Sequence, residues 1–434
     1  MRNHHTRLGL FGTAMAITGV LASCTTGGGG GGGTTPPPES VPPVTRITSS
    51  IEQSNVRSRP SISADGNVVV FDSDANLVGG DNNQGNGKTD VFVLVRSTGI
   101  ITRVTGGNDR SGGASITGNG RYVVFNSQAN DLVPGDNNNT DDVFVYDRVL
   151  LTTRDITATA SSWSDSGAVS DDGHWAVVGT SNNYDGLPSP SLNNSPRNIF
   201  LLDLTGVAAP LRITNGNDDS ESPVISGDGS RVVFQSRATD LDLVDANGNA
   251  SDIFTWDRVG GALTRITNGT ISPDPEGPTS EFPTISSDGT HIAFHSAASD
   301  LLPSGDSNGS FDVFEWIQGT GIVRITDQAS GRSGAPSIST NGQHIVFISE
   351  GTGLTPGPDA NGLGVDYFVW DASDGHITRL TNGDSIGIGN DGEGISWPSV
   401  SDSGKVAVFG TTATNLGGTD NNGHGSDMYI SVRP

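Results

Sequence analysis

The sequence predicts an all-β protein in which residues 44–434 form a seven-bladed β-propeller of four-stranded antiparallel blades. Three observations predict this fold class: a composition rich in turn-forming residues, a repeat with a period of about 55 residues, and short apolar runs within each repeat. The 434 residues include 61 Gly and 22 Pro. Both disfavour helices, because Gly loses the most backbone entropy there and Pro lacks the amide hydrogen.

Two markers recur along the chain with the same period. The first is Arg-Ile-Thr or a close variant, with its arginine at Arg46, Arg103, Arg154, Arg212, Arg265, Arg324 and Arg379. The second is a turn of the form Ser-x-Asp/Asn-Gly or a variant of it, with its glycine at Gly66, Gly120, Gly173, Gly229, Gly289, Gly342 and Gly404. Seven copies of each marker predict seven structural units.

Each unit contains four short strands, as residues 212–258 illustrate. Apolar runs of four or five residues are separated by Gly, Asn and Asp, and Asp228-Gly229 between two runs is a hairpin signal. A phenylalanine follows the turn glycine by five residues at Phe71, Phe125, Phe234, Phe294, Phe347 and Phe409, and the third unit has Val178 there. We expect these side chains to form the core between neighbouring sheets.

The two ends of the repeat region indicate how the ring closes. The region begins with an isolated strand, residues 44–48, and ends with a strand at residues 427–431 that no Arg-Ile-Thr follows. We therefore expect the N-terminal strand to complete the last blade, which leaves no unpaired sheet.

The N-terminus reads as a targeting segment followed by a tether. Residues 1–23 combine Arg2 and Arg7 with a 14-residue apolar run that is too short for a permanent membrane span. Residues 21–24, Leu-Ala-Ser-Cys, resemble the lipobox of bacterial lipoproteins, which implies a signal peptide over 1–23 and lipidation of Cys24. The alternative is a plain secretory signal with an incidental cysteine. Residues 24–43 then form a Gly/Pro-rich tether, so we expect an exported protein, lipid-anchored in the cell envelope at the outer membrane or periplasmic face.

The repeat also resembles a known family. The pattern Pro-x-x-Ser-x-Asp-Gly, an apolar strand with Phe-x-Ser, an Asp-x-Phe strand and Arg-Ile-Thr is similar to the TolB-like, WD40-like (PD40) propeller repeat, with copies at residues 60–66 and 283–289. The resemblance covers the chain after the tether and implies a propeller, envelope location and protein binding. TolB itself has six such blades and a preceding small α/β domain, so its partners are not carried over.

Six units carry an acidic loop that offers oxygen ligands, the kind that Ca²⁺ prefers. Each loop contains Asp-x-Asn and then an Asp just before the next strand: Asp81, Asn83, Asp90; Asp136, Asn138, Asp142; Asp245, Asn247, Asp252; Asp306, Asn308, Asp312; Asp359, Asn361, Asp366; and Asp420, Asn422, Asp427. These loops resemble the short calcium loops of integrin-type propellers and dockerins. Asp and Asn also cap turns by accepting nearby backbone amides, so both metal binding and structural turn chemistry stay open.

Charge and motifs narrow the function. The net charge of −25 disfavours nucleic acid as a partner, and a single cysteine excludes a disulfide framework. No nucleophile elbow, zincin or phosphate-loop motif is present, and no catalytic residue is assigned.

His291 and His344 share a variable repeat position that we expect to face solvent, and the repeated arginines are expected to pair with a carboxylate in their own blade. We expect a scaffold that binds an envelope protein or polysaccharide; the alternatives are a lyase or hydrolase acting on envelope polysaccharide or peptidoglycan, and a structural surface protein without a ligand.

Overall fold

A computed structural model describes the part of the chain that forms the propeller. The chain divides into a unit of residues 1–38 and a unit of residues 39–434, and every structural statement below concerns the second. The described residues are 41–48, 59–78, 88–136, 140–157, 164–181, 196–242, 244–275, 277–306, 308–326, 330–356, 364–382, 396–416 and 426–434. The signal peptide, Cys24 and the tether up to residue 40 lie outside them.

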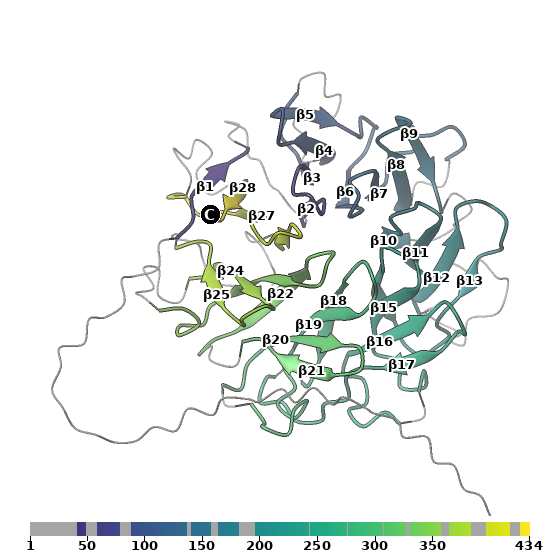
Figure 1. Cartoon of the computed structure of the whole chain (residues 1–434). Helices are drawn as coiled ribbons and strands as arrows, with labels where there is room; N and C mark the ends of the chain where they lie inside the picture. Colours follow the sequence, from purple (N-terminus) through teal and green to yellow (C-terminus); the bar gives the residue numbers. More distant parts are fainter. Residues whose placement is uncertain are drawn as a thin grey trace, which may run out of the picture. The chain divides into compact units, whose positions relative to one another are not determined.

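The described part of the chain contains 28 strands and no helix, arranged as seven four-stranded antiparallel sheets around a common centre (Figure 1). In chain order, from the centre of the ring outward, the first three blades are β2 (Ser61–Ile62), β3 (Val68–Ser73), β4 (Asp90–Val95) and β5 (Ile100–Arg103); β6 (Ser111–Ile116), β7 (Tyr122–Ser127), β8 (Asp142–Asp147) and β9 (Thr152–Asp155); and β10 (Ser164–Val169), β11 (Trp175–Thr180), β12 (Asn198–Asp203) and β13 (Leu211–Arg212).

The next three blades repeat the same order: β14 (Ser220–Ile225), β15 (Arg231–Ser236), β16 (Asp252–Asp257) and β17 (Leu263–Arg265); β18 (Ser280–Ile285), β19 (His291–Ser296), β20 (Asp312–Ile317) and β21 (Gly321–Arg324); and β22 (Ser333–Ile338), β23 (His344–Ser349), β24 (Asp366–Asp371) and β25 (Ile377–Arg379). The seventh blade consists of β26 (Ser399–Val400), β27 (Val406–Thr411), β28 (Asp427–Val432) and, from the N-terminus, β1 (Val44–Arg46). The predicted fold class and blade count are therefore confirmed.

The ring closes as the chain ends predict. Strand β1 pairs antiparallel with β28, with Val44 opposite Ser431 and Arg46 opposite Tyr429. Thr48, just after β1, donates its hydroxyl hydrogen to Asp427 Oδ1 at 2.8 Å and accepts the Met428 amide at 3.0 Å. The Arg-Ile-Thr marker thus belongs to the outer strand of a blade, so the sequence repeat is offset from the blade by one strand.

The repeated phenylalanines form the core between blades. In six blades the predicted aromatic stacks on a second ring of the adjacent strand, as in Phe71 with Phe92 at 5.7 Å and Phe125 with Phe144 at 5.5 Å between ring centroids. In the third blade Val178 lies opposite Phe200 and both are fully buried. These side chains pack with aliphatic residues of the neighbouring blade into clusters that run around the ring.

The turn glycines pack each blade against the one before it. Gly342 has a φ of +71°, and a Cβ there would lie 2.7 Å from His291 Cδ2 of the preceding blade. The turn of the next blade therefore covers the repeat position that His291 and His344 share. This contact corrects the expectation that the position faces solvent. His344 is 8% exposed and lies 3.3 Å from Asp371, while His291 Nδ1 lies 2.8 Å from Glu315.

Hydrogen bonds between successive hairpin turns tie the blades together at one end of the ring. The amide of Ala64 donates to the Gly118 carbonyl, and the amide of Asp402 donates to the Ala64 carbonyl, both at 2.9 Å. Every neighbouring pair of blades has such a link through a backbone or side-chain donor. Ser287 also donates to Asp171 Oδ2 of a non-adjacent blade at 3.0 Å, so the turns converge at this narrow end.

Replacing Gly342 by alanine tests the close approach between blades. The added methyl group meets both the positive φ, which costs about 1–2 kcal/mol, and the His291 ring, which adds about 1–3 kcal/mol of overpacking. The matched control is Gly375→Ala, since Gly375 has a φ of +72° and open space around it. We expect Gly342→Ala to lower the thermal unfolding temperature clearly more than Gly375→Ala; equal shifts would show that only the backbone angle matters.

Candidate functional site: the wide end of the channel

A large cavity lies at the opposite end of the ring, where the inner strands begin. It has a volume of about 810 Å³, and residues in or directly before the inner strands of all seven blades line it. At the narrow end, beside the converging hairpin turns, the corresponding cavity measures about 200 Å³. The channel is therefore a funnel, and its wide end has the larger volume for a candidate site.

A repeated bulge shapes the wall of this funnel. The inner strands β6, β14, β18 and β22 each shift register against their neighbour, and the bulge residue has a positive φ in each: Gly113, Ser222, Phe282 and Ala335. Three of these are not glycine, so their backbone is strained, which is typical of functional sites. Arg59 and Trp397 stand at the equivalent positions of the first and seventh blades, directly before Pro60 and Pro398.

Arg59, Phe282 and Trp397 form one wall of the wide end. The Arg59 guanidinium carbon lies 3.5 Å from the Trp397 ring centroid and 5.4 Å from that of Phe282. The two aromatic rings meet edge to face at 4.1 Å. The small Ala335 stands at the equivalent position of the sixth blade, which leaves room for Phe282 and Trp397 to meet. Three residues from three separate repeats are thus brought together.

Arg59 is a cation without a counter-ion among the described residues. No carboxylate of that part of the chain pairs with its guanidinium, and burial lowers the pKa of Arg59 to about 9. The stack on Trp397 stabilises the charge by up to about 2 kcal/mol. A partly buried charge that lacks a partner and lines a cavity is suited to binding an anion.

His295 supports this wall from behind. Its ring packs edge-on against Phe282 at 5.2 Å and against Phe311 at 5.1 Å, and its Nδ1 accepts the amide hydrogen of Ala335 at 3.2 Å. Burial, together with the positive charges of Arg59 and Arg332, lowers the pKa of His295 to about 3. His295 is therefore neutral at physiological pH, and it does not line the cavity.

The opposite wall is polar and partly acidic. Asp141 accepts hydrogen bonds from Arg110 at 3.2 Å and from Gln128 at 3.0 Å, and Asp72 and Asn126 line the same side. The wide end therefore has an aromatic, cationic wall on one side and a hydrogen-bonding wall on the other.

The acidic loops lie at this same end of the ring. For two of them, the structure describes all three of the predicted residues. In the fourth blade, Arg265 lies 3.5 Å from Asp245 and 2.6 Å from Asp252, and Asn247 donates to Asp252 at 3.2 Å. The fifth blade repeats this arrangement, with Arg324 at 3.6 Å from Asp306 and 3.5 Å from Asp312 and with Asn308 donating to Asp312. An arginine and turn hydrogen bonds thus engage these carboxylates, and calcium binding there stays a prediction.

The other predicted loop residues are described only in part. Asp90, Asp366 and Asp427 each begin a strand and pair with the arginine of their own blade, as expected for the marker. The remaining residues lie outside the described part of the chain: Asp81, Asn83, Asn138, Asp359, Asn361, Asp420 and Asn422.

The second blade departs from the pattern and corrects one marker. The register places Asp155 opposite Phe144, where the other blades have arginine, and Arg154 is one residue out of register. Arg154 instead donates to the Leu204 carbonyl of the next blade. The sequence 152–157, Thr-Thr-Arg-Asp-Ile-Thr, contains an arginine beside the true position, which explains the wrong assignment.

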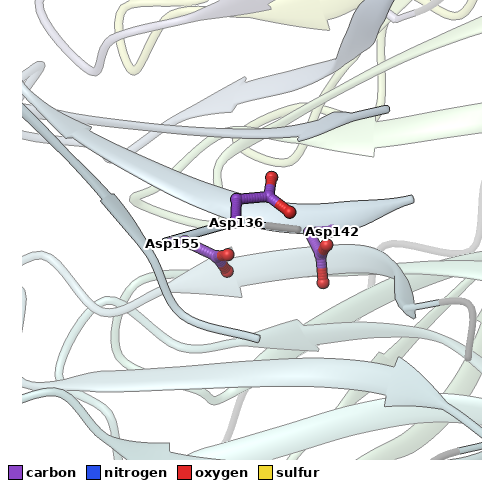
Figure 2. Close-up of side chains that lie close together, drawn as sticks. All are labelled: Asp136, Asp142 and Asp155. Atoms are coloured by element: carbon purple, nitrogen blue, oxygen red, sulfur yellow. The ribbon is translucent and has the colours of Figure 1, made fainter. Parts of the chain in front are cut away.

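Asp155 therefore joins two of the predicted loop residues. Carboxylate oxygens of Asp136, Asp142 and Asp155 lie within 4.8 Å of one another (Figure 2). Burial and the charges of Asp142 and Asp136 raise the pKa of Asp155 to about 6. The sequence analysis predicts Asp136 and Asp142 but not Asp155, because the neighbouring Arg154 matches the arginine of the marker.

Sequence reasoning also missed Arg59, Phe282 and Trp397. The repeat motif begins at the proline that follows each of them, and the residue before it differs in every blade, so no pattern marked it. The available signal was this variation itself. The proline recurs in five of the seven blades, and the residue before it is charged or aromatic in three of those five, before Pro60, Pro283 and Pro398.

Comparisons with known proteins identify the fold. No protein-family model matches the chain, and no curated protein matches it. Among solved structures, it is similar to an oligogalacturonate lyase from Vibrio parahaemolyticus, at 16% identity and a TM-score of 0.57, covering 90% of this chain and 93% of that one. It is also similar to the β-propeller domain of the trilobed protease from Pyrococcus furiosus, at 13% identity and a TM-score of 0.55, covering 88% and 96%.

A third match is TolB from Acinetobacter baumannii, at 16% identity and a TM-score of 0.40, covering 80% of this chain and 76% of that one. The β-propeller fold that the TolB-like repeat implies is confirmed by the seven blades of the structure and by the first two of these matches. Within the described residues, no helix is long and apolar enough to span a membrane.

The neutral state of His295 predicts a pH dependence of stability. The folded protein disfavours protonation of His295 down to pH 3, whereas the unfolded chain protonates it below its usual pKa of 6.5. Stability is therefore lost as the pH falls below 6.5, by up to about 2 kcal/mol at pH 5 from this group. Urea unfolding at pH 7.5 and 5.0 should show a smaller acid loss in His295→Gln, whose amide oxygen still accepts the Ala335 amide. An equal loss in the variant would mean that His295 is protonated in the folded protein.

Proposed function

We propose that the protein is an envelope-tethered binding module that takes a carboxylate-bearing glycan at the wide end of its propeller channel. The observation that carries this proposal is the unpaired guanidinium of Arg59, stacked on Trp397 in the wall of the cavity. A carboxylate on the ligand supplies the missing counter-ion through charge-assisted hydrogen bonds. The solvent-accessible parts of Phe282 and Trp397 supply apolar surface for sugar rings, and the polar wall around Asp141 supplies hydrogen-bond partners for hydroxyl groups.

The overall negative charge does not oppose this binding. The net charge of −25 is spread over the whole chain. At physiological ionic strength, charges separated by more than about 8 Å of solvent are largely screened. Arg59 and the aromatic rings therefore dominate the electrostatic potential at their own wall. The carboxylates of the opposite wall disfavour ligands that carry negative charge on both sides.

Binding without turnover is favoured over a lyase or hydrolase activity. The oligogalacturonate lyase match shares 16% identity, which supports the fold and no more. The neutral His295 packs against Phe282 and does not line the cavity, and no histidine is among the described residues that line it. A protein partner that presents a carboxylate is the other ligand class compatible with this wall.

Calorimetric titration with oligogalacturonate tests the proposal, with its methyl ester as the uncharged control ligand. We expect wild-type protein to bind the acid and not the ester, and Arg59→Gln to weaken binding at least tenfold because the counter-ion contact is lost. Arg237→Gln removes an exposed arginine that does not line the cavity and should bind like wild type. Absence of binding, or equal binding by Arg59→Gln, would contradict the proposal. Mass spectrometry of the same mixtures detects shortened or unsaturated products, which would establish the lyase or hydrolase alternative.

The tether is tested by Cys24→Ser in the full-length protein. Acyl chains contribute about 0.8 kcal/mol per buried methylene to membrane binding, so the loss of the only cysteine should release the protein from the membrane fraction. Fractionation and mass measurement of the N-terminus should show a soluble, unacylated variant beside an acylated, membrane-bound wild type. A variant that still partitions with membranes would rule out lipid anchoring through Cys24.

A further inference from the structure

The second blade replaces a cation by an anion at a buried position. In the fourth and fifth blades, two loop and strand carboxylates surround the guanidinium of Arg265 or Arg324. In the second blade the same two positions are Asp136 and Asp142, and the position of the arginine is taken by Asp155. The group of three side chains therefore carries a formal charge of −3, where its counterparts carry −1.

This group of carboxylates is buried and incompletely hydrogen-bonded. Asp136 is 7% exposed and Asp142 is fully buried. Oδ1 of Asp136 and Oδ2 of Asp155 are both buried, and neither has a hydrogen-bond partner. Unpartnered buried oxygens of this kind are costly, and three adjacent anions repel one another, so the site needs a positive charge that the chain itself supplies in the other blades.

We propose that Asp136, Asp142 and Asp155 bind one Ca²⁺ ion, which takes the place of the arginine found in the other blades. The three ligand oxygens lie within 4.8 Å of one another, so a single ion can reach all of them at the 2.3–2.6 Å typical of Ca²⁺. Mg²⁺ gives up its water ligands reluctantly and rarely binds in a site built from protein oxygens alone, so a cluster of three protein carboxylates favours Ca²⁺. Figure 2 shows the three side chains lying close together, and they come from the loop before β8, the start of β8 and the end of β9.

The ion would join the same elements that the arginine joins elsewhere. In the fourth blade Arg265 ties the end of the outer strand to the loop and to the start of the third strand. A Ca²⁺ ion in the second blade connects the corresponding points of β9, the loop and β8. We therefore assign it a structural role, in which this one blade depends on calcium and the fourth and fifth blades do not.

The variant Asp155→Arg tests the inference by restoring the residue of the other blades. Wild-type protein freed of metal by chelation is titrated with CaCl₂ in a calorimeter, and its thermal unfolding is recorded in EDTA and in CaCl₂. We expect Ca²⁺ to raise the unfolding temperature of wild type by several degrees, with MgCl₂ at least tenfold weaker in affinity. Asp155→Arg should lose one equivalent of Ca²⁺, unfold in EDTA at or above the wild-type temperature, and no longer respond to Ca²⁺ at this site.

Two further variants keep the test decisive. Asp155→Asn preserves the size of the side chain and should weaken the affinity for Ca²⁺ at least tenfold. This variant tests the site even if the larger arginine side chain of Asp155→Arg disturbs the fold. Asp245→Asn in the fourth blade should leave the number of bound ions and the calcium-dependent shift unchanged. Identical unfolding of wild type in EDTA and CaCl₂, or an unchanged number of bound ions in both Asp155 variants, would overturn the inference.

Discussion

A buried hydrogen bond between a threonine hydroxyl and a side-chain oxygen at the start of the third strand recurs in all seven blades. Thr105 donates to Asp90 at 2.7 Å, Thr157 to Asp142 at 2.8 Å and Thr214 to Asn198 at 3.2 Å, and the other four blades repeat the contact. The same threonine oxygen accepts the next backbone amide in the third strand, as at Val91 and Val143. This contact fixes the outer strand against the third strand, and through Thr48 and Asp427 it also closes the ring. A carboxylate buried in this way needs a positive charge nearby, and that requirement explains the repeated arginine.

The two blades that break the rule show how closely these positions are coupled. In the third blade the strand begins with the neutral Asn198, and Arg212 turns instead to Asn215 at 2.9 Å. In the second blade the carboxylates remain and the arginine is lost, which leaves a surplus of negative charge around Asp142. The residue at the start of the third strand and the residue at the arginine position are thus coupled through charge. Where the carboxylate is lost, the arginine contacts another residue, and where the arginine is lost, the carboxylates need another cation.

The sequence predicted those parts of the structure that repeat, because each repeat is an independent observation of the same physical requirement. Seven turn glycines, six core phenylalanines and the isolated first strand were enough to predict the blade count and the closure. The prediction was wrong at Arg154, where an arginine adjacent to the true position satisfied the marker and only the pairing of Asp155 with Phe144 reveals the register. It was also wrong about the exposure of His344, since burial there depends on contact with the turn of the next blade, which no pattern within one repeat encodes.

The candidate site could not be predicted for the opposite reason, since it is made of residues that do not repeat. Arg59, Phe282 and Trp397 are separated by more than a hundred residues and meet only because their blades lie around one centre. The narrow end offers little freedom for such variation, because its turns are joined by hydrogen bonds all around the ring. At the wide end, the equivalent positions carry side chains that range from glycine to tryptophan, and side chains of the preceding blade hold the backbone amides of Phe282 and Ala335. The repeated scaffold thus places residues that differ from blade to blade around one mouth of the channel, which is where the proposed binding site lies.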